Sequence, residues 1–310
     1  MRRTGICIAL AYAVSAFSPC EAFAIVGQTY NVPPGPAPST LASGDVLNVF
    51  PAGLVAGDAN LNVGAGSVVN IQGGTITSEV DSFGEVNLYS GAINSIFISR
   101  PGSSLNVYGG SLGAGSINSS ATWNLFAGQI ATPISVQGTA VINIEGAEIG
   151  GGISMFGGTI NLSEGSLGAG IGPVVDTQFN MTGGTLHHFQ FGNGSVWNLS
   201  GGSIPGHYEV SVLNIRATSA FLSGVPISTP LGQETTITQR NVTLSGVLQD
   251  GSPYSLDLTS TFGGIGDFVP VEATVTVTLV PEPATAMTIA IASICLFFTP
   301  LRMGCGRPRN

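Results

Sequence analysis

The chain of 310 residues is rich in glycine and poor in charge, with 45 glycines and only 8% charged residues against 43% apolar ones. Soluble domains average roughly 25% charged residues and about 7% glycine, so the composition argues against an ordinary globular enzyme, although enough apolar residues remain to form a core. All eight basic residues are arginine, and between residues 25 and 301 three of them stand against sixteen acidic residues, a balance of 3 − 16 = −13. Phosphate binding needs clustered lysine or arginine, so nucleic acid is excluded as a partner.

The first 24 residues have the layout of a secretory signal peptide. Arg2 and Arg3 precede an apolar run over residues 6–17, and the small residues Ala22 and Ala24 follow. This order is typical of export signals, and cleavage is expected after Ala24. The alternative is a first buried helix. Residues 25–44 are polar and proline-rich, which predicts an extended lead-in or an N-terminal cap.

One phrase recurs over residues 45–218: an apolar residue, asparagine, an apolar residue, a glycine-rich turn and then an aliphatic residue. The asparagines are Asn48, Asn70, Asn87, Asn106, Asn124, Asn143, Asn161, Asn180, Asn198 and Asn214. Their mean step is (214 − 48)/9, about 18.4 residues. A fixed period near twenty is typical of repeats that stack in a line.

The residues on both sides of each asparagine are large and apolar in every repeat, as in Leu105-Asn106-Val107. In a strand these two neighbours share one face and the asparagine takes the other. We therefore expect the apolar pair to point inward, and the asparagines to form an outward column that exchanges amide hydrogen bonds. The aliphatic residue six positions later, Leu54 in the first repeat, is expected to return to the core. A third apolar patch, such as Ile134–Val136, predicts three short strands per coil.

These features predict an all-β fold, a parallel β-solenoid of about ten coils of 18–19 residues. A right-handed wind is favoured, because parallel crossovers are almost always right-handed. The left-handed alternative has a similar coil length, but its hexapeptide pattern is missing. Residues 219–280 lack the period and predict a small antiparallel β cap. In it, the pair Asp250-Gly251 signals a hairpin between strands at 235–248 and 254–258, and residues 269–280 would supply another strand.

The last thirty residues have three parts. Pro281-Glu282-Pro283 comes first, residues 284–301 follow without a charge, and Arg302, Arg307 and Arg309 end the chain. Eighteen residues without a charge are near the minimum length for a transmembrane helix, and arginine after that helix places the last residues in the cytoplasm. The rest of the chain would then lie outside.

This tail, behind an export signal, resembles the PEP-CTERM sorting signal of Gram-negative bacteria. The resemblance covers only the tail, and it implies that a membrane exosortase recognises Pro281, Glu282 and Pro283 and processes the protein for surface delivery. One departure from the pattern is Pro300, which interrupts the helix near its end. The alternative is a simple C-terminal anchor behind a proline-bearing linker.

The sequence predicts no catalytic residue, no metal ligand and no cofactor. The densest acidic groups are Glu79, Asp81 and Glu85, then Glu145 with Glu148; we expect a solvated face at each, with a weak calcium site as the alternative. The neighbours His187 and His188 would face opposite ways on a strand. One of them could serve as a base, but nothing in the sequence names a partner for it.

The expected function is that of an exported structural or adhesive protein of the cell surface or extracellular matrix. Its expected partners are the export machinery, an exosortase-like enzyme, the membrane through the C-terminal helix and, through the resemblance, biofilm exopolysaccharide. The alternative is a secreted carbohydrate-active enzyme or carbohydrate-binding module on the same scaffold. An outward groove lined by Tyr89, Tyr108, Phe126 and acidic residues would favour that alternative.

Overall fold

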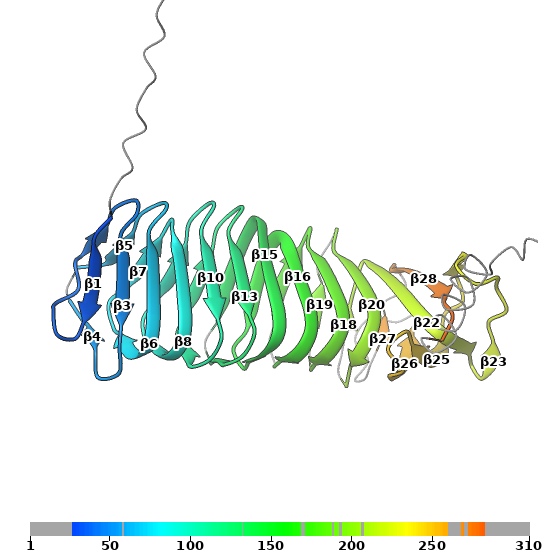
Figure 1. The fold of residues 1–310 in the computed structure, drawn as a ribbon. Coiled ribbons are helices and arrows are strands. Elements are labelled where there is room, and N and C mark those ends of the chain that lie inside the picture. Colours follow the sequence, from blue (N-terminus) through cyan, green and yellow to red (C-terminus); the bar gives the residue numbers. More distant parts are fainter. Residues whose placement is uncertain are drawn as a thin grey trace, which may run out of the picture.

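The computed structural model describes residues 27–57, 59–131, 133–168, 171–187, 189–191, 194–205, 208–259, 268–269 and 272–282. This part of the chain is all-β, with 28 strands and no helix. It forms a parallel β-solenoid of about nine turns, seen in Figure 1 as a straight rod with residue order running along its length.

Each coil contributes strands to three faces. The first, which we call the ladder face, carries the repeated asparagines in parallel, in-register strands. Strands confined to it are β1 (Thr29–Val32), β3 (Val46–Val49), β10 (Ser104–Val107) and β13 (Thr122–Leu125). Strands that turn from it onto the second face are β6 (Val68–Ile76), β8 (Glu85–Ile93), β18 (Gln178–Leu186) and β20 (Val196–Ser203).

The other two faces are built from shorter strands. The second face also holds β4 (Leu54–Val55), β11 (Ser111–Leu112) and β14 (Gln129–Ile130). The third face consists of β2 (Thr40–Leu41), β5 (Leu61–Val63), β7 (Val80–Ser82), β9 (Phe97–Ser99), β12 (Gly115–Ile117), β17 (Ile171–Val175), β19 (Phe189–Phe191) and β21 (Tyr208–Glu209). β15 (Ile134–Ile149) and β16 (Ile153–Leu167) each pass through all three faces.

The core runs through the middle of the rod. The residues on either side of the ten predicted asparagines are all buried, none more than 1% exposed, as the alternation predicted. Trp123 is among the largest side chains of this core and is fully buried. Its Nε1 donates a hydrogen bond to Ser99 Oγ at 2.7 Å. Its ring packs edge-on against Phe97, with centroids 5.8 Å apart. Each coil therefore buries its apolar residues against its neighbours.

Leu54 is a wrong prediction, because its side chain is 56% exposed and Val55 is buried in its place. Val55 pairs with Ile76 of the next coil, and it stands seven residues after Asn48, whereas Ile76 stands six after Asn70. One additional residue before β4 exchanges the two faces of a strand. The same coil contains the longest step of the repeat.

The glycines at the corner between the ladder face and the second face bring successive coils close together. Gly110 has φ +84°, in the left-handed region that other residues avoid. A Cβ atom added to Gly110 would also clash with the carbonyl oxygen of Gly91 in the preceding coil. Both the backbone angle and the stacking therefore require glycine here.

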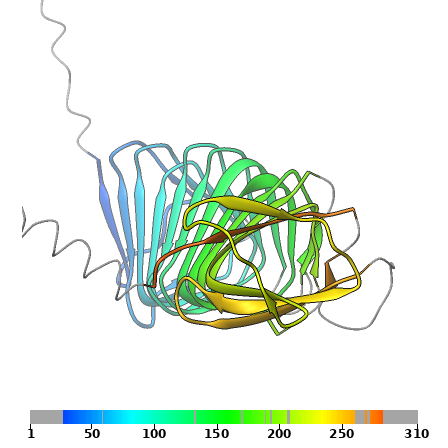
Figure 2. The ribbon, with the colours of Figure 1, turned by 90° about the vertical axis from the view of Figure 1, so that its right-hand side faces the viewer.

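The rod has about nine turns where about ten coils were predicted. Its C-terminal end departs from the repeat at β22 (Val212–Leu222). The first half of β22, up to Ile215, continues the ladder face beside β20. From Ala217 onward β22 pairs antiparallel with β25. The strands that follow are β23 (Val225–Pro226), β24 (Glu234–Ile237), β25 (Val242–Leu248), β26 (Pro253–Leu258), β27 (Phe268–Val269) and β28 (Thr274–Leu279). Figure 2 shows these strands lying across the end of the rod.

The cap is mixed rather than purely antiparallel. The predicted hairpin is present, since β25 and β26 pair antiparallel on either side of Asp250-Gly251. β28, however, pairs parallel with β22 and antiparallel with β24, so it adds one further rung to the ladder face. The strand predicted over residues 235–248 is divided into β24 and β25, with Asn241 at φ +59° between them.

Candidate functional site

The asparagine column is the most regular chemical feature of the surface. Each asparagine donates its Nδ2 to Oδ1 of the asparagine one coil earlier, in an unbroken series of hydrogen bonds of 2.7 to 3.1 Å from Asn214 back to Asn48. All donors point toward the N-terminal end, so the column has a direction. The side chains are mostly half-buried between their neighbours.

The structure extends the column beyond the ten predicted positions. At the N-terminal end, Asn48 Nδ2 donates to Asn31 Oδ1 at 3.0 Å. At the C-terminal end, Thr276 Oγ1 donates to Asn214 Oδ1 at 3.0 Å. Both were visible in the sequence, since Tyr30-Asn31-Val32 and Val275-Thr276-Val277 keep the alternation of an apolar, a polar and an apolar residue. Because the amides bond to one another along the column, they are arranged for stacking more than for holding a ligand.

An aromatic column lies two residues after the asparagines in three successive coils. The rings of Tyr89 and Tyr108 are 5.0 Å apart at 8°, and those of Tyr108 and Phe126 are 4.9 Å apart at 11°. The central ring therefore has a neighbour on each face, and the column presents ring edges to solvent. A sugar that stacks on an aromatic side chain needs a free ring face, and both faces of the Tyr108 ring are covered by its neighbours.

The acidic group Glu79, Asp81 and Glu85 is divided among three separate partners. Arg100 holds Asp81 through two hydrogen bonds of 2.7 and 2.8 Å, and Asn60 donates to Glu79 Oε1 at 2.7 Å. Asn87 donates to Glu85 Oε1 at 2.8 Å. The hydrogen bond to Asp81 raises the pKa of the Arg100 guanidinium. Among the described residues, no three histidine, cysteine, aspartate or glutamate side chains come together as metal ligands.

The second acidic group, Glu145 with Glu148, lies in β15, where Glu148 is on the second face. Glu145 lies beside Glu164 of the next coil in the strand register. Glu148 and the exposed His187 both line a shallow hollow of about 260 Å³ on the second face, together with Gln129. His188 lies outside the described residues.

The predicted sorting signals are described only in part. Pro281 and Glu282 are exposed and follow directly after Val280, whose backbone N–H donates to the carbonyl of Ala217 in β22. Pro283, Ala22, Ala24 and the predicted helix over 284–301 lie outside the described residues. Within the described ranges, no helix is long and apolar enough to cross a membrane.

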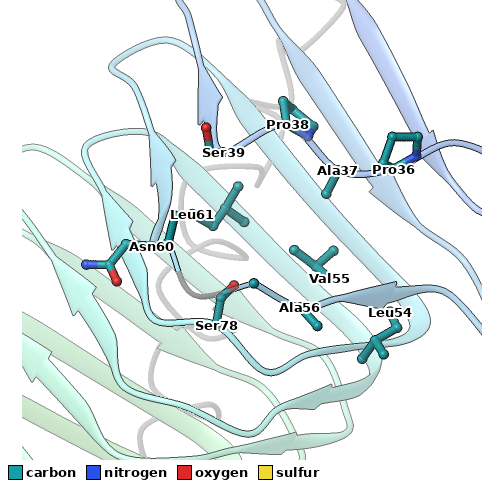
Figure 3. Close-up of a pocket in the computed structure, with 12 residues that line it drawn as sticks. Pro36, Ala37, Pro38, Ser39, Leu54, Val55, Ala56, Asn60, Leu61 and Ser78 are labelled. Atoms are coloured by element: carbon teal, nitrogen blue, oxygen red, sulfur yellow. The ribbon is translucent and has the colours of Figure 1, made fainter.

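A small pocket near the N-terminal end was not foreseen from the sequence. It has a volume of about 180 Å³, and it lies between the proline-rich segment 36–39 and residues 54–57 and 59–61. Figure 3 shows these two segments on opposite sides of the pocket, with Ser78 on the side of residues 54–57 and the Asn60 side chain turned away from the pocket. The signal that could have located it is the 22-residue step from Asn48 to Asn70, the longest in the repeat.

No protein-family model, curated protein or solved structure matches this chain.

Proposed function

We propose that the protein is an exported structural or adhesive rod of the cell surface or extracellular matrix. The observation that carries the proposal is the directional asparagine column, which runs the whole length of the rod and ends at Thr276 in the cap. Such a column joins each coil to the next and is suited to a stiff, extended scaffold.

The route to the surface is part of the same proposal. A signal peptide over residues 1–24, cleaved after Ala24, delivers the chain to the export machinery. The helix over 284–301 then anchors it transiently, and an exosortase-like enzyme recognises Pro281, Glu282 and Pro283. The exposed position of Pro281 and Glu282, immediately after the cap, supports access by such an enzyme. Prolines at 281 and 283 remove backbone donors and favour an extended chain there. The rod is expected to wind right-handed.

The sorting step is tested by replacing Pro281, Glu282 and Pro283 together with alanine in the native host. We expect the variant to stay in the membrane fraction, while the unchanged protein reaches the surface or the medium. Pro230→Ala, an exposed proline in the cap, is the matched control and should leave release unchanged. Normal release of the triple variant would refute the sorting proposal.

The second candidate is a carbohydrate-active enzyme on the same scaffold, and the hollow that Glu148 shares with His187 favours it. A carboxylate and an imidazole in one depression are the side-chain types that general acid–base catalysis uses. The secreted protein should be incubated with acidic and neutral polysaccharides and assayed for new reducing ends or unsaturated products. Cleavage of one polysaccharide that is lost in Glu148→Gln would establish the enzyme and reject a purely structural role.

A further inference from the structure

The middle of the ladder face carries two parallel rows of outward side chains, which we call the two-row patch. One row is the asparagine column over residues 106–161, and the other stands two residues earlier in each coil. The members of this second row are partners of one another in the strand register: Ser104, Thr122, Val141 and Thr159. Half-buried and buried residues alternate in these strands, so both rows point outward. Figure 1 shows β10, β13, β15 and β16 side by side along the straight rod.

The two-row patch carries no charge. Neither row contains an acidic or basic residue over these coils. Glu145 lies at the margin of the patch, two residues after Asn143, where β15 turns toward the second face. The other two faces do present charges, with Asp81 and Arg100 on the third face and Glu148 on the second. Charged groups hold their hydration water strongly, so an uncharged patch can more readily exchange its surface water for an ordered ligand.

The asparagine amides of the patch use only half of their hydrogen-bonding capacity within the column. Each Nδ2 donates one hydrogen bond to the preceding coil and each Oδ1 accepts one from the next. An amide has two N–H groups and two carbonyl lone pairs, so each coil keeps one donor and one acceptor for another partner. Thr122, Val141 and Thr159 are β-branched and have few rotamers. Both rows are therefore held in place before a ligand arrives, which lowers the entropy cost of binding.

The spacing of the rows identifies a ligand that repeats in two directions. Successive coils lie about 4.8 Å apart, and the two rows are two residues, or about 6.6 Å, apart along each strand. The oxygen atoms on the prism faces of hexagonal ice form a rectangular net with spacings close to these. Each water molecule in ice also both donates and accepts hydrogen bonds, as each amide requires.

We propose that the two-row patch binds the prism face of ice. One water molecule of the crystal bonds to the remaining N–H and lone pair of each asparagine amide. The methyl groups of Thr122, Val141 and Thr159 pack against the water molecules between these anchors. Because every coil of the patch repeats the same contact, the contacts add up along the rod.

Two other occupants fit the patch less well. A single polysaccharide chain repeats in one direction only, so it matches one row and not the net. A second copy of the rod has the right spacing, but a face-to-face contact would remove water from the remaining polar groups of every amide. Each group left unpaired in such a contact would cost about 1 to 3 kcal/mol. Ice replaces these water molecules with others in fixed positions.

The test is the affinity of the full chain for ice. A single ice crystal is grown slowly from a solution of the chain and serum albumin, and the protein content of the ice is compared with that of the remaining liquid. The thermal hysteresis, which is the gap between the melting and freezing temperatures, is measured in the same buffer. We expect enrichment of the chain over serum albumin in the ice and a measurable hysteresis, because adsorbed molecules curve the ice front between them and lower the temperature at which it advances.

Matched variants place the binding on the two-row patch. Thr122→Tyr raises a ring at the centre of the patch, and we expect it to lower the hysteresis at least about twofold, because the ring keeps the neighbouring rows from contact. Ser116→Tyr, the same change at a half-buried outward position on the third face, should bind ice as the unchanged chain does. Thr159→Tyr and Ser154→Tyr form a second such pair within β16, which decides the question if Thr122→Tyr fails to fold.

The outcomes separate an ice-binding face from a merely structural one. Absence of both enrichment and hysteresis in the unchanged chain would overturn the proposal, as would equal losses in the patch variants and their third-face controls. A dimer that is seen by ultracentrifugation and lost in Thr122→Tyr, without ice binding, would assign the patch to a second copy of the rod and would also overturn it. Surface release and polysaccharide cleavage do not depend on this patch, so its failure leaves the proposed function standing.

Discussion

The two ends of the rod complete the same asparagine column in different ways. At the C-terminal end, the last acceptor, Asn214 Oδ1, receives a hydrogen bond from Thr276, 62 residues later in the chain. At the N-terminal end, the last residue of the column is the exposed Asn31, covered by no further strand in the described residues. The difference follows from the direction of the column, because one end leaves an acceptor and the other leaves an amide donor.

The two ends of the rod limit pairing of their exposed backbone with another strand by different means. At the C-terminal end, the Asp250 carboxylate accepts hydrogen bonds from the backbone N–H of Gly202 and of Ser252, at 2.8 and 2.9 Å, and so fastens the hairpin to the last coil. Arg240, between β24 and β25, donates to the carbonyl of Ala273 at 2.6 Å and so joins this turn to the start of β28. At the N-terminal end, the proline-rich loop lacks many backbone donors, which limits pairing with another strand. The cap at one end and the proline-rich loop at the other therefore both limit pairing of the rod end with a strand of another chain.

Substitutions in the regular coils should lower the free energy of unfolding more than substitutions at either end. Glycine substitutions should show the largest difference. Gly110→Ala places a Cβ against the backbone of the preceding coil at φ +84°, whereas Gly251→Ala in the cap hairpin has φ +95° and no atom within 4 Å of the added Cβ. We expect Gly110→Ala to lower the free energy of unfolding by about 4 kcal/mol and Gly251→Ala by about 1 kcal/mol. Urea denaturation measures both, and equal losses would show that the close approach of coils contributes nothing.

Interrupting the column in its middle should have the next largest effect. Asn143→Ala leaves the Nδ2 of Asn161 without an acceptor and the Oδ1 of Asn124 without a donor. We expect a loss of about 2 kcal/mol in the free energy of unfolding. Ser135→Ala, on the third face of the same β15 strand, is the control and should change stability by less than about 0.5 kcal/mol. If the two variants are equally stable, the amide column does not stabilise the rod.

A third prediction concerns the hydrogen bonds that hold the cap to the last coil. Asp250→Ala removes the carboxylate that holds Gly202 and Ser252, and we expect a loss of about 1.5 kcal/mol. The matched control is Asp257→Ala, which removes a single exposed hydrogen bond from Thr243 and should cost less than about 0.5 kcal/mol. Hydrogen exchange should report the loosening in β25 and β26 and not in β6. Uniform acceleration along the rod would contradict a local role of Asp250.

The two last residues of the column can be compared directly. Thr276→Val keeps the shape of a side chain that is 6% exposed but leaves Asn214 Oδ1 without that donor. We expect a loss of about 1 kcal/mol. Asn31→Ala removes an exposed acceptor whose partner, Asn48, can turn to water, so less than about 0.5 kcal/mol should be lost. Urea denaturation of both variants measures these losses, and a larger loss at Asn31 would reverse the comparison.

The smallest effect is expected from the ion pair on the third face. The Arg100 and Asp81 side chains are 38% and 18% exposed, and such partly exposed pairs contribute between about 0 and 1 kcal/mol. Arg100→Met should therefore lower stability by no more than about 0.5 kcal/mol, and the difference should shrink in high salt. A salt-independent loss above about 2 kcal/mol would indicate a packing role for the arginine stem instead.

The sequence by itself determined the repeat and the direction of its side chains. The alternation around each asparagine places every flanking residue in the core, because the side-chain period of a strand leaves no other arrangement. It also determined the hairpin at Asp250-Gly251, whose turn chemistry is local. Each of these features depends on residues that are close together in the chain.

Only the tertiary structure decided what happens where the period changes. Leu54 points outward because one additional residue shifts the register of β4, and that shift becomes visible only against Ile76 of the next coil. The parallel placement of β28 beside β22 joins residues more than sixty positions apart and has no local signal. The pocket at Ser78 likewise arises from three coils together. The repeat length of the sequence determines the contacts between regular coils. The conformation of the irregular coils and of the ends depends instead on contacts with segments that are distant in the chain.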